Sequence, residues 1–279
     1  MSDFVSAVEL NDLLTRGEPV RVIDVRWRLD RPEAGHGDYL TGHIPGAVFV
    51  GLDTELATHG EPSEGRHPLP STAALQEAAR RWGVRAGDTV VAYDDFKSIS
   101  AARAWWLLRQ GGIDVRVLDG GIQGWKAAGF DVATDDVRPE PGDVVLRPIG
   151  GDAISIDEAA AFPASGVLID ARAADRYRGD SEPYDPVGGH IPGARNLPEP
   201  VHFDAQGRIL DRETILASLA EVGVAPGTTV AAYCGSGVTA AHTALVLHEV
   251  GIDAKVFPGS WSQWSNTPGR PVATGDQPG

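Results

Sequence analysis

The chain has 279 residues and carries 39 acidic against 24 basic side chains, which gives a formal net charge of −15. This length accommodates two domains of ordinary size, each with its own core. The excess of acidic residues argues against nucleic acid and anionic membranes as partners, because both bind clustered positive charge.

Several absences narrow the class of protein further. No apolar run approaches the roughly 20 residues needed to cross a bilayer, and the N-terminus lacks the basic and apolar pattern of a secretion signal. We therefore expect a cytoplasmic protein. The chain has 1 cysteine, which excludes an intrachain disulfide and a cysteine-rich metal site. The histidines have no ligand-like spacing, so we expect neither a metal nor another cofactor.

The first half of the chain is predicted to alternate strands and helices. An apolar strand at 20–24 is followed by the motif Gly-His-Ile-Pro-Gly-Ala at 42–47 and by a second strand at 87–93. The continuous apolar run of this second strand is typical of a strand buried on both faces of a parallel sheet. The segment 101–110 has the helical period and ends before a glycine.

The second half repeats this order. The strand 167–170, the same hexapeptide motif at 189–194, a second strand at 227–233 and a helical segment at 240–250 follow one another. One domain is therefore duplicated. We predict an α/β fold in which each domain has a mostly parallel sheet flanked by helices. The expected domains are 1–134 and 151–279, joined by an acidic, Pro/Gly-containing linker at 135–150.

The cysteine lies where ligands bind in open α/β sheets, beyond the carboxyl end of a strand. Cys234 directly follows the strand 227–233 and precedes two glycines and a helix start. Such a loop lets backbone N–H groups converge on an anion, and the positive end of the helix favours the thiolate. We predict that Cys234 is the nucleophile, against the alternative of a cysteine that only packs there. The expected substrate-binding loop positions are Gly235, Gly237, Val238 and Thr239.

The matching loop of the first half has different chemistry. Asp94 stands at the position of Cys234, and the residues that follow it up to Ser98 include no glycine. We therefore expect no thiol chemistry and no anion cradle in this half. The first domain is predicted to be non-catalytic.

Cysteine on a glycine loop is used in two chemistries. A phosphatase needs an arginine six positions after the cysteine to clamp phosphate, and this chain has Ala240 there. Sulfur transfer remains, in which the thiolate accepts sulfur and the loop stabilises the persulfide. A non-catalytic persulfide carrier for a protein partner stays open as an alternative.

These motifs resemble the tandem rhodanese family over nearly the whole chain. The resemblance rests on the paired Gly-His-Ile-Pro-Gly motifs, the Cys-Gly-Ser-Gly-Val-Thr loop and the terminal segment from Gly259 to Trp264. The loop is similar to that of 3-mercaptopyruvate sulfurtransferases, whereas thiosulfate sulfurtransferases typically carry Cys-Arg-Lys-Gly-Val-Thr. The resemblance implies sulfur transfer from 3-mercaptopyruvate, or alternatively thiosulfate, through a Cys234 persulfide. The implied acceptors are cyanide, a small thiol or thioredoxin.

The resemblance also implies roles for further residues. Arg176 would bind the anionic group of the donor, with Arg172 as a weaker candidate. Ser236 would act with His43 from the first domain's motif and with Asp30. Because the motif recurs in both halves, His43 can instead be purely structural.

One stretch departs from the family pattern. Mercaptopyruvate enzymes tend to have a second donor arginine in a Glu-Pro-x-Pro-Arg segment, and this chain reads Glu-Pro-Tyr-Asp-Pro at 182–186. The expected preference for mercaptopyruvate therefore rests on Ser236. Its hydroxyl can donate a proton to a departing enolate, whereas a lysine there would favour departing sulfite.

Overall fold

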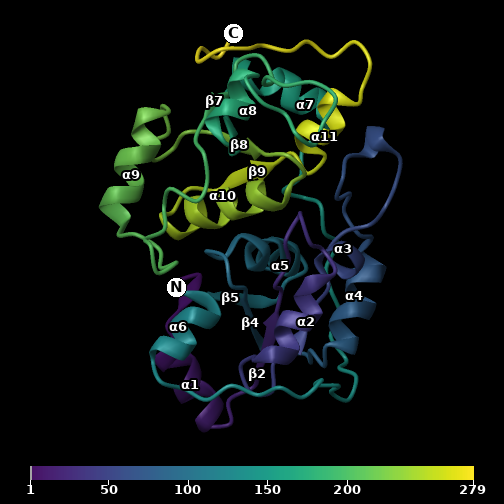
Figure 1. Ribbon diagram of the computed structural model, residues 1–279, viewed down its shortest axis with the longest axis vertical. Helices are drawn as coiled ribbons and strands as arrows, with labels where there is room; N and C mark the ends of the chain where they lie inside the picture. The colour runs from purple at the N-terminus through teal and green to yellow at the C-terminus, as the bar shows by residue number, and fades with distance from the viewer. Residues whose placement is uncertain (1) are drawn as a thin grey trace. The chain divides into compact units, whose positions relative to one another are not determined.

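The computed structural model describes residues 2–279, and this part of the chain divides into two compact units (Figure 1). Unit 1 comprises the chain up to Thr58 together with Leu69–Gly151 and Phe203–Ile209. Unit 2 comprises His59–Pro68, Asp152–His202 and Leu210–Gly279. Each unit thus includes one short segment from the other half of the sequence. Within residues 2–279, no helix combines the length and the apolar character that crossing a membrane requires.

Unit 1 is built on a parallel sheet with the strand order β1-β5-β4-β2-β3. The strands are β1 (Phe4–Val5), β2 (Val20–Asp24), β3 (Val48–Phe49), β4 (Thr89–Tyr93) and β5 (Asp114–Leu118). The central strand β4 is apolar and almost wholly buried, as its sequence predicts for a strand covered on both faces.

Helices complete unit 1. They are α1 (Ala7–Thr15), α2 (Ala34–Thr41), α3 (Leu52–Glu55), α4 (Thr72–Arg81), α5 (Ile99–Gln110) and α6 (Gly121–Ala127). Local sequence sets where they begin. Ser6 and Glu9 form a reciprocal capping box at α1, and the Ser71 hydroxyl accepts the N–H of Ala74 at α4.

Unit 2 repeats this architecture with the strand order β7-β6-β8-β9, again all parallel. The strands are β6 (Val167–Asp170), β7 (Arg195–Asn196), β8 (Val230–Tyr233) and β9 (Ala254–Val256). The helices are α7 (Ile156–Ala161), α8 (Ala174–Arg178), α9 (Arg212–Glu221), α10 (Val238–Glu249) and α11 (Ser260–Ser265), with short 3₁₀ turns at Pro62–Glu64 and Phe162–Ala164. Helix α10 packs along β8 and β9 (Figure 1). The predicted α/β class is confirmed.

The repeated Gly-His-Ile-Pro-Gly motif does the same structural work in each unit. The ring of His43 stacks on Tyr39 with the centroids 3.9 Å apart, and Nδ1 lies 3.0 Å from the carbonyl oxygen of Tyr39. His190 repeats both contacts with Tyr177, at 3.7 Å and 2.9 Å. The motif therefore ties a strand connection to the helix before it.

Residues 135–150, which the sequence predicts to be a linker, are counted within unit 1 and are hydrogen-bonded there. The N–H of Gly142 donates to the carbonyl of Arg80, and the N–H of Arg147 donates to that of Gly111. Val144 and Leu146 are buried. This segment is therefore an ordered strap on unit 1.

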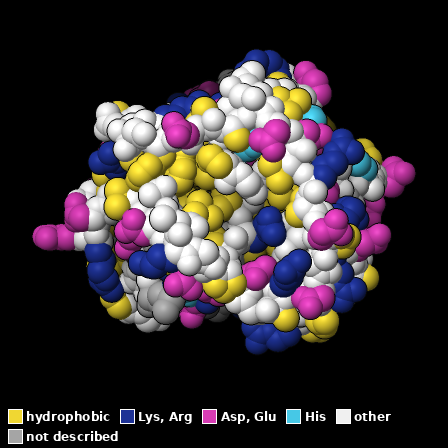
Figure 2. Space-filling view, turned by 90° about the horizontal axis from the view of Figure 1, so that it is seen from below, with side chains coloured by type: hydrophobic (Ala, Val, Ile, Leu, Met, Phe, Trp, Pro, Cys, Tyr) yellow, Lys and Arg dark blue, Asp and Glu magenta, His cyan; other side chains and the backbone are white. Residues whose placement is uncertain are grey.

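The surface carries mixed charge on the face drawn in Figure 2. Acidic and basic side chains are interspersed there around a group of hydrophobic side chains. The acidic net charge of the chain is therefore not gathered into a patch of one sign on this face.

Candidate active site

The cysteine loop of unit 2 connects β8 to α10, as the sequence predicts. Cys234 is 2% exposed, and its Sγ accepts the N–H of Gly237 over 3.1 Å. Gly237 has a φ of 84°, and a Cβ atom there would lie only 2.4 Å from the carbonyl oxygen of Pro258. A side chain at this position would therefore deform the turn that directs an N–H group at the sulfur atom.

The loop is fixed from a second side by the start of α11. The N–H groups of Trp261 and Ser262 donate to the carbonyls of Cys234 and Gly235, each over 2.9 Å. The N–H of Cys234 donates to Oγ of Ser260 over 3.1 Å. These bonds fix the backbone at Cys234, as a preorganised site requires.

Ser236 has a histidine partner that sequence reasoning did not identify. Its Oγ lies 2.8 Å from Nδ1 of His67, and both side chains are buried. His67 belongs to the segment His59–Pro68, which is part of unit 2 although it comes from the first half of the chain. The hydroxyl beside the nucleophile can therefore exchange a proton with an imidazole.

His43 and Asp30, which the resemblance suggested for this role, have other surroundings. His43 is fully buried in unit 1 against Tyr39, and Asp30 lies in an exposed turn of that unit. The histidine that the structure places against Ser236 is His67.

Two arginines lie beside the cysteine loop. A Cβ atom built on Gly235 would be 3.3 Å from Nη1 of Arg176 and 3.8 Å from Nη1 of Arg66. Gly235 thus leaves room for two guanidinium groups. Arg176 also forms ion pairs with Glu182 at 2.7 Å and with Asp185 at 3.3 Å.

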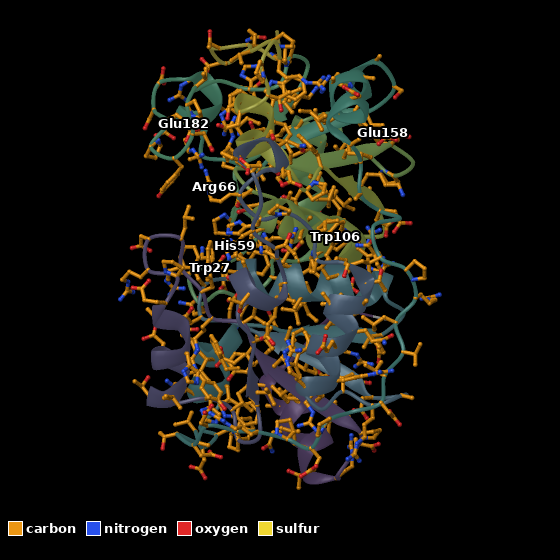
Figure 3. The ribbon with its side chains drawn as sticks, turned by 90° about the vertical axis from the view of Figure 1, so that its right-hand side faces the viewer. Trp27, His59, Arg66, Trp106, Glu158 and Glu182 are labelled. Carbon is orange, nitrogen blue, oxygen red and sulfur yellow. The ribbon has the colours of Figure 1, made fainter. Side chains whose placement is uncertain are left out.

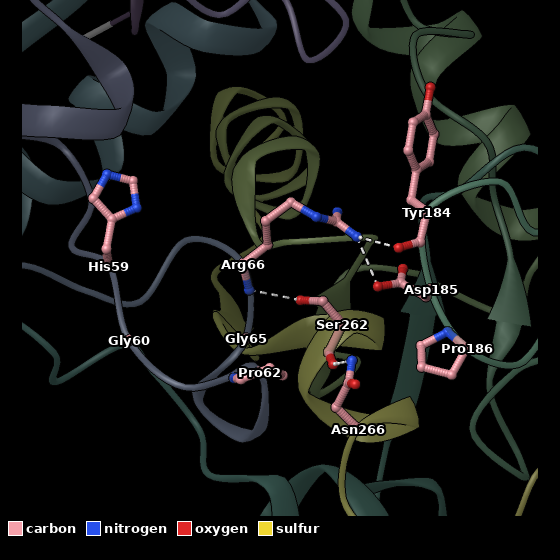
Figure 4. A pocket seen from close by; sticks show the side chains of 10 residues that line it. All are labelled: His59, Gly60, Pro62, Gly65, Arg66, Tyr184, Asp185, Pro186, Ser262 and Asn266. Carbon is pink, nitrogen blue, oxygen red and sulfur yellow. Dashed lines mark hydrogen bonds and ion pairs between the residues drawn. The ribbon is translucent and has the colours of Figure 1, made fainter.

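Arg66 comes from the same segment as His67 and lines a pocket of about 470 Å³. Its Nη2 lies 2.6 Å from Oδ1 of Asp185, and its backbone N–H donates to Oγ of Ser262 over 2.9 Å (Figure 4). Because Ser262 also bonds Gly235, this pocket adjoins the cysteine loop. Burial raises the pKa of Asp185, and the charge of Arg66 opposes that rise.

Arg172 has a different environment from Arg176. It is buried, pairs with Asp170 at 2.7 Å, and lies 4.4 Å from the ring centroid of Trp261. Burial lowers the pKa of its guanidinium, but the charge and hydrogen bond of Asp170, together with the charges of Tyr233 and Glu182, leave the pKa raised. Its Nη2 also donates to the carbonyl of Gly189. These contacts occupy the guanidinium of Arg172, whereas Nη1 of Arg176 lies beside Gly235.

Among residues 2–279, no group of three or more His, Cys, Asp or Glu side chains is arranged to hold a metal ion. The chemistry that the site itself offers is nucleophilic attack by sulfur, anion binding by guanidinium groups and proton transfer by a hydroxyl and an imidazole.

Comparison with known proteins decides the family. The model of the rhodanese-like domain matches residues 6–128 and again 155–267. The chain belongs to the rhodanese-like family. A Mycobacterium tuberculosis protein provisionally named as a thiosulfate sulfurtransferase is 46% identical over 97% of this chain and 96% of its own length.

Two further relatives are named for mercaptopyruvate. A Pseudomonas aeruginosa protein provisionally named as a 3-mercaptopyruvate sulfurtransferase is 42% identical over 91% of this chain and 92% of its own length. The solved 3-mercaptopyruvate sulfurtransferase from Leishmania major superimposes with a TM-score of 0.83 at 31% identity, over 94% of this chain and 74% of that one. The prediction of a two-domain rhodanese-type sulfurtransferase is therefore confirmed.

The two rhodanese-like domains share one framework around their loops. In unit 1, Arg26 pairs with Asp24 at 2.6 Å and donates to the carbonyl of Gly42. These are the contacts that Arg172 makes with Asp170 and Gly189 in unit 2. A pair that recurs in both rhodanese-like domains serves the shared fold.

The loop of the first rhodanese-like domain corrects one expectation. The sequence predicts no anion cradle there, yet backbone N–H groups converge on the carboxylate of Asp94. Oδ1 accepts the N–H groups of Phe96 and Ser98, and Oδ2 accepts those of Ser100 and Ala101, over 2.8 to 3.0 Å. The cradle exists without glycine, because Lys97 and Ser98 adopt positive φ angles. The carboxylate of Asp94, which belongs to the same loop, occupies this cradle.

Proposed function

We propose that this chain transfers sulfur from 3-mercaptopyruvate to a thiol or cyanide acceptor, with Cys234 carrying the sulfur as a persulfide. The choice of donor rests on the 2.8 Å contact between Ser236 and His67 beside the only cysteine. A hydroxyl with an imidazole partner can supply the proton that a departing enolate needs.

The first half-reaction forms the persulfide. The Cys234 thiolate attacks the donor sulfur, the bond between that sulfur and carbon 3 breaks, and its electron pair goes to the enolate of pyruvate. The Gly237 N–H, already bonded to Sγ, stabilises negative charge on sulfur. The enolate takes its proton from the Ser236 hydroxyl, and Ser236 takes one from Nδ1 of His67.

The second half-reaction restores the enzyme. The nucleophilic carbon of cyanide, or a thiolate, attacks the outer sulfur of the persulfide, and the electron pair of the S–S bond returns to Cys234. We infer that thioredoxin or small thiols serve as acceptors in a cytoplasmic setting. A lone cysteine without a disulfide suits that reducing environment.

Arg176 binds the carboxylate of the donor in this proposal. Its Nη1 lies closest to Gly235, the residue after the nucleophile, while Nε and Nη2 bond Glu182. Those two bonds hold the guanidinium plane in one orientation, so that the remaining N–H groups can meet a carboxylate fork.

Thiosulfate is the second candidate donor. The observation that favours it is the name of the M. tuberculosis relative, which is 46% identical to this chain. Thiosulfate would use the same persulfide, with sulfite leaving in place of pyruvate.

The test compares the two donors side by side. We expect the kcat/KM for 3-mercaptopyruvate to exceed that for thiosulfate, and Arg176→Ala to lower both by roughly 30-fold or more, as expected for losing a desolvated charged partner. A wild-type enzyme that prefers thiosulfate would refute the choice of donor. An Arg176→Ala enzyme with unchanged kcat/KM would refute the role of Arg176.

A further inference from the structure

We infer that Arg66 is a second donor-binding arginine and that Asp185 sets the charge of the donor site, so that the site selects singly charged over doubly charged donors. This inference rests on the proposed function, because it concerns the donor of the same persulfide reaction. It assigns roles to two residues on opposite walls of the pocket beside the cysteine loop.

The two arginines converge from different segments. Arg66 lies just before His67, whereas Arg176 is on α8, yet both present Nη1 toward Gly235. The ion pairs that hold them use Nη2 of Arg66 and Nε and Nη2 of Arg176. Two N–H-bearing atoms from separate guanidinium groups therefore face the nucleophile's neighbour, where a carboxylate could bridge them.

Tyr184 and Asp185 keep the two guanidinium groups together. The Tyr184 ring centroid lies 5.7 Å from the central carbon of Arg66 and 5.2 Å from that of Arg176. The buried Asp185 carboxylate offers one oxygen to each arginine. Figure 4 shows Arg66 reaching across the pocket toward these two residues. Asp185 therefore joins an arginine of the segment His59–Pro68 to an arginine of α8.

The acids balance the charge of the arginines. Glu182 pairs with Arg172 at 3.2 Å and with Arg176 at 2.7 Å, while Asp170 pairs with Arg172. The cluster contains the arginines at 66, 172 and 176 and the acids at 170, 182 and 185, and therefore has no net charge.

A site of this kind attracts anions through the direction of its N–H groups rather than through net charge. Mercaptopyruvate has one negative charge, on its carboxylate. Two N–H groups that each bond one carboxylate oxygen are enough to stabilise it. Thiosulfate carries two charges, and a neutral cluster leaves the second without a counter-charge. The net charge of the whole chain, −15, adds to this disadvantage.

The experiment changes the charge of the cluster in both directions. Asp185→Asn adds one positive charge and should raise the ratio of kcat/KM for thiosulfate to that for mercaptopyruvate about tenfold, because a dianion gains twice what a monoanion gains. Arg66→Met removes one positive charge and should lower the same ratio by a similar factor. It should also reduce kcat/KM for mercaptopyruvate roughly tenfold or more.

Two controls separate charge from structure. The double variant Arg66→Met/Asp185→Asn restores the wild-type charge, so its donor ratio should return to within about threefold of wild type. Glu158→Gln makes the same charge change as Asp185→Asn, but Glu158 lies on the opposite side of unit 2 from Arg66 and Glu182 (Figure 3). Its donor ratio should not move.

The inference is overturned if Arg66→Met and Asp185→Asn move the donor ratio in the same direction, or if neither moves it. That result would mean that the two residues only support the fold. Failure of the proposed function looks different, because then wild-type enzyme would acquire no sulfur on Cys234 from either donor, as intact-protein mass spectrometry would show.

Discussion

The loops at 94–101 and 234–239 occupy the same place in two copies of one domain and solve the same electrostatic problem differently. In the first, four backbone N–H groups bond the carboxylate of Asp94, which is 1% exposed. In the second, the N–H of Gly237 bonds the sulfur of Cys234. Backbone N–H groups therefore point at an acidic side chain in both loops.

The difference separates structure from catalysis. In the first loop the carboxylate of Asp94 already accepts the four N–H groups, so these groups cannot bind a substrate anion. A cysteine fills the second loop with an atom that can accept and release another sulfur. Burial raises the pKa of Asp94, while the N–H groups of Ala101, Phe96 and Ser100 lower it. The N–H groups thus offset part of the cost of burying the charge.

The largest expected effect comes from removing the sulfur nucleophile. Cys234→Ser should abolish turnover, with a loss of roughly 1,000-fold or more, because a serine hydroxyl cannot form a persulfide. Incubation with donor should add the mass of one sulfur atom to wild type and none to the variant. A variant that retained turnover would place the chemistry outside this loop.

The next largest effect concerns the hydroxyl of Ser236, two residues after Cys234. The first loop has Phe96 two residues after Asp94. Ser236→Ala should lower kcat/KM for mercaptopyruvate roughly 100-fold, as expected for loss of general acid catalysis. Thiosulfate should lose much less, because departing sulfite needs no proton. An equal loss with both donors would show that Ser236 acts only by shaping the loop.

Asp94→Asn tests the filled cradle. The amide keeps one acceptor oxygen but turns an NH₂ group toward two N–H donors, so we expect a loss of about 2–4 kcal/mol in the free energy of unfolding. Urea denaturation followed by fluorescence measures it. At temperatures where the variant stays folded, persulfide formation should remain within about twofold of wild type. A loss of activity approaching that of Cys234→Ser would reverse the assignment of the catalytic domain.

The smallest expected effect is a change of donor preference. Ser236→Lys with Gly235→Arg introduces the loop residues typical of thiosulfate enzymes and should raise the ratio of kcat/KM for thiosulfate to that for mercaptopyruvate by about tenfold. The effect is limited because a side chain at 235 meets Arg176, whose Nη1 would lie 3.3 Å from its Cβ. The single variant Ser236→Lys separates the charge at 236 from this crowding, and an unchanged ratio in both variants would contradict the prediction.

The duplication explains why much of the fold could be predicted. The strands expected at 87–93 and 227–233 contain the observed β4 (Thr89–Tyr93) and β8 (Val230–Tyr233). The sequence pattern of each copy supported the strand and helix assignments in the other. Cys234 was found because its loop joins a buried strand to a helix, a local pattern that fixes both its position and its chemistry.

The partners of the loop could not be predicted in the same way. His67 and Arg66 lie in a segment without helical or strand periodicity, and their place beside Ser236 and Asp185 depends on contacts across more than a hundred residues of chain. The familiar motif drew attention to His43, whose role follows from its stacking on Tyr39. The signal that could have helped was Pro186, which stands where the Glu-Pro-x-Pro-Arg pattern has its arginine and so left a basic residue to be found elsewhere.

The assignment of His59–Pro68 to unit 2 has a consequence for how this enzyme can be shortened. A gene fragment encoding 151–279 would retain the cysteine, its loop and Arg176, yet it would lack His67 and Arg66. Such a fragment would be a sulfur acceptor without its proton source. Residues His59–Pro68, encoded in the first half of the chain, therefore have to be kept in any shortened form that is meant to retain the surroundings of Ser236.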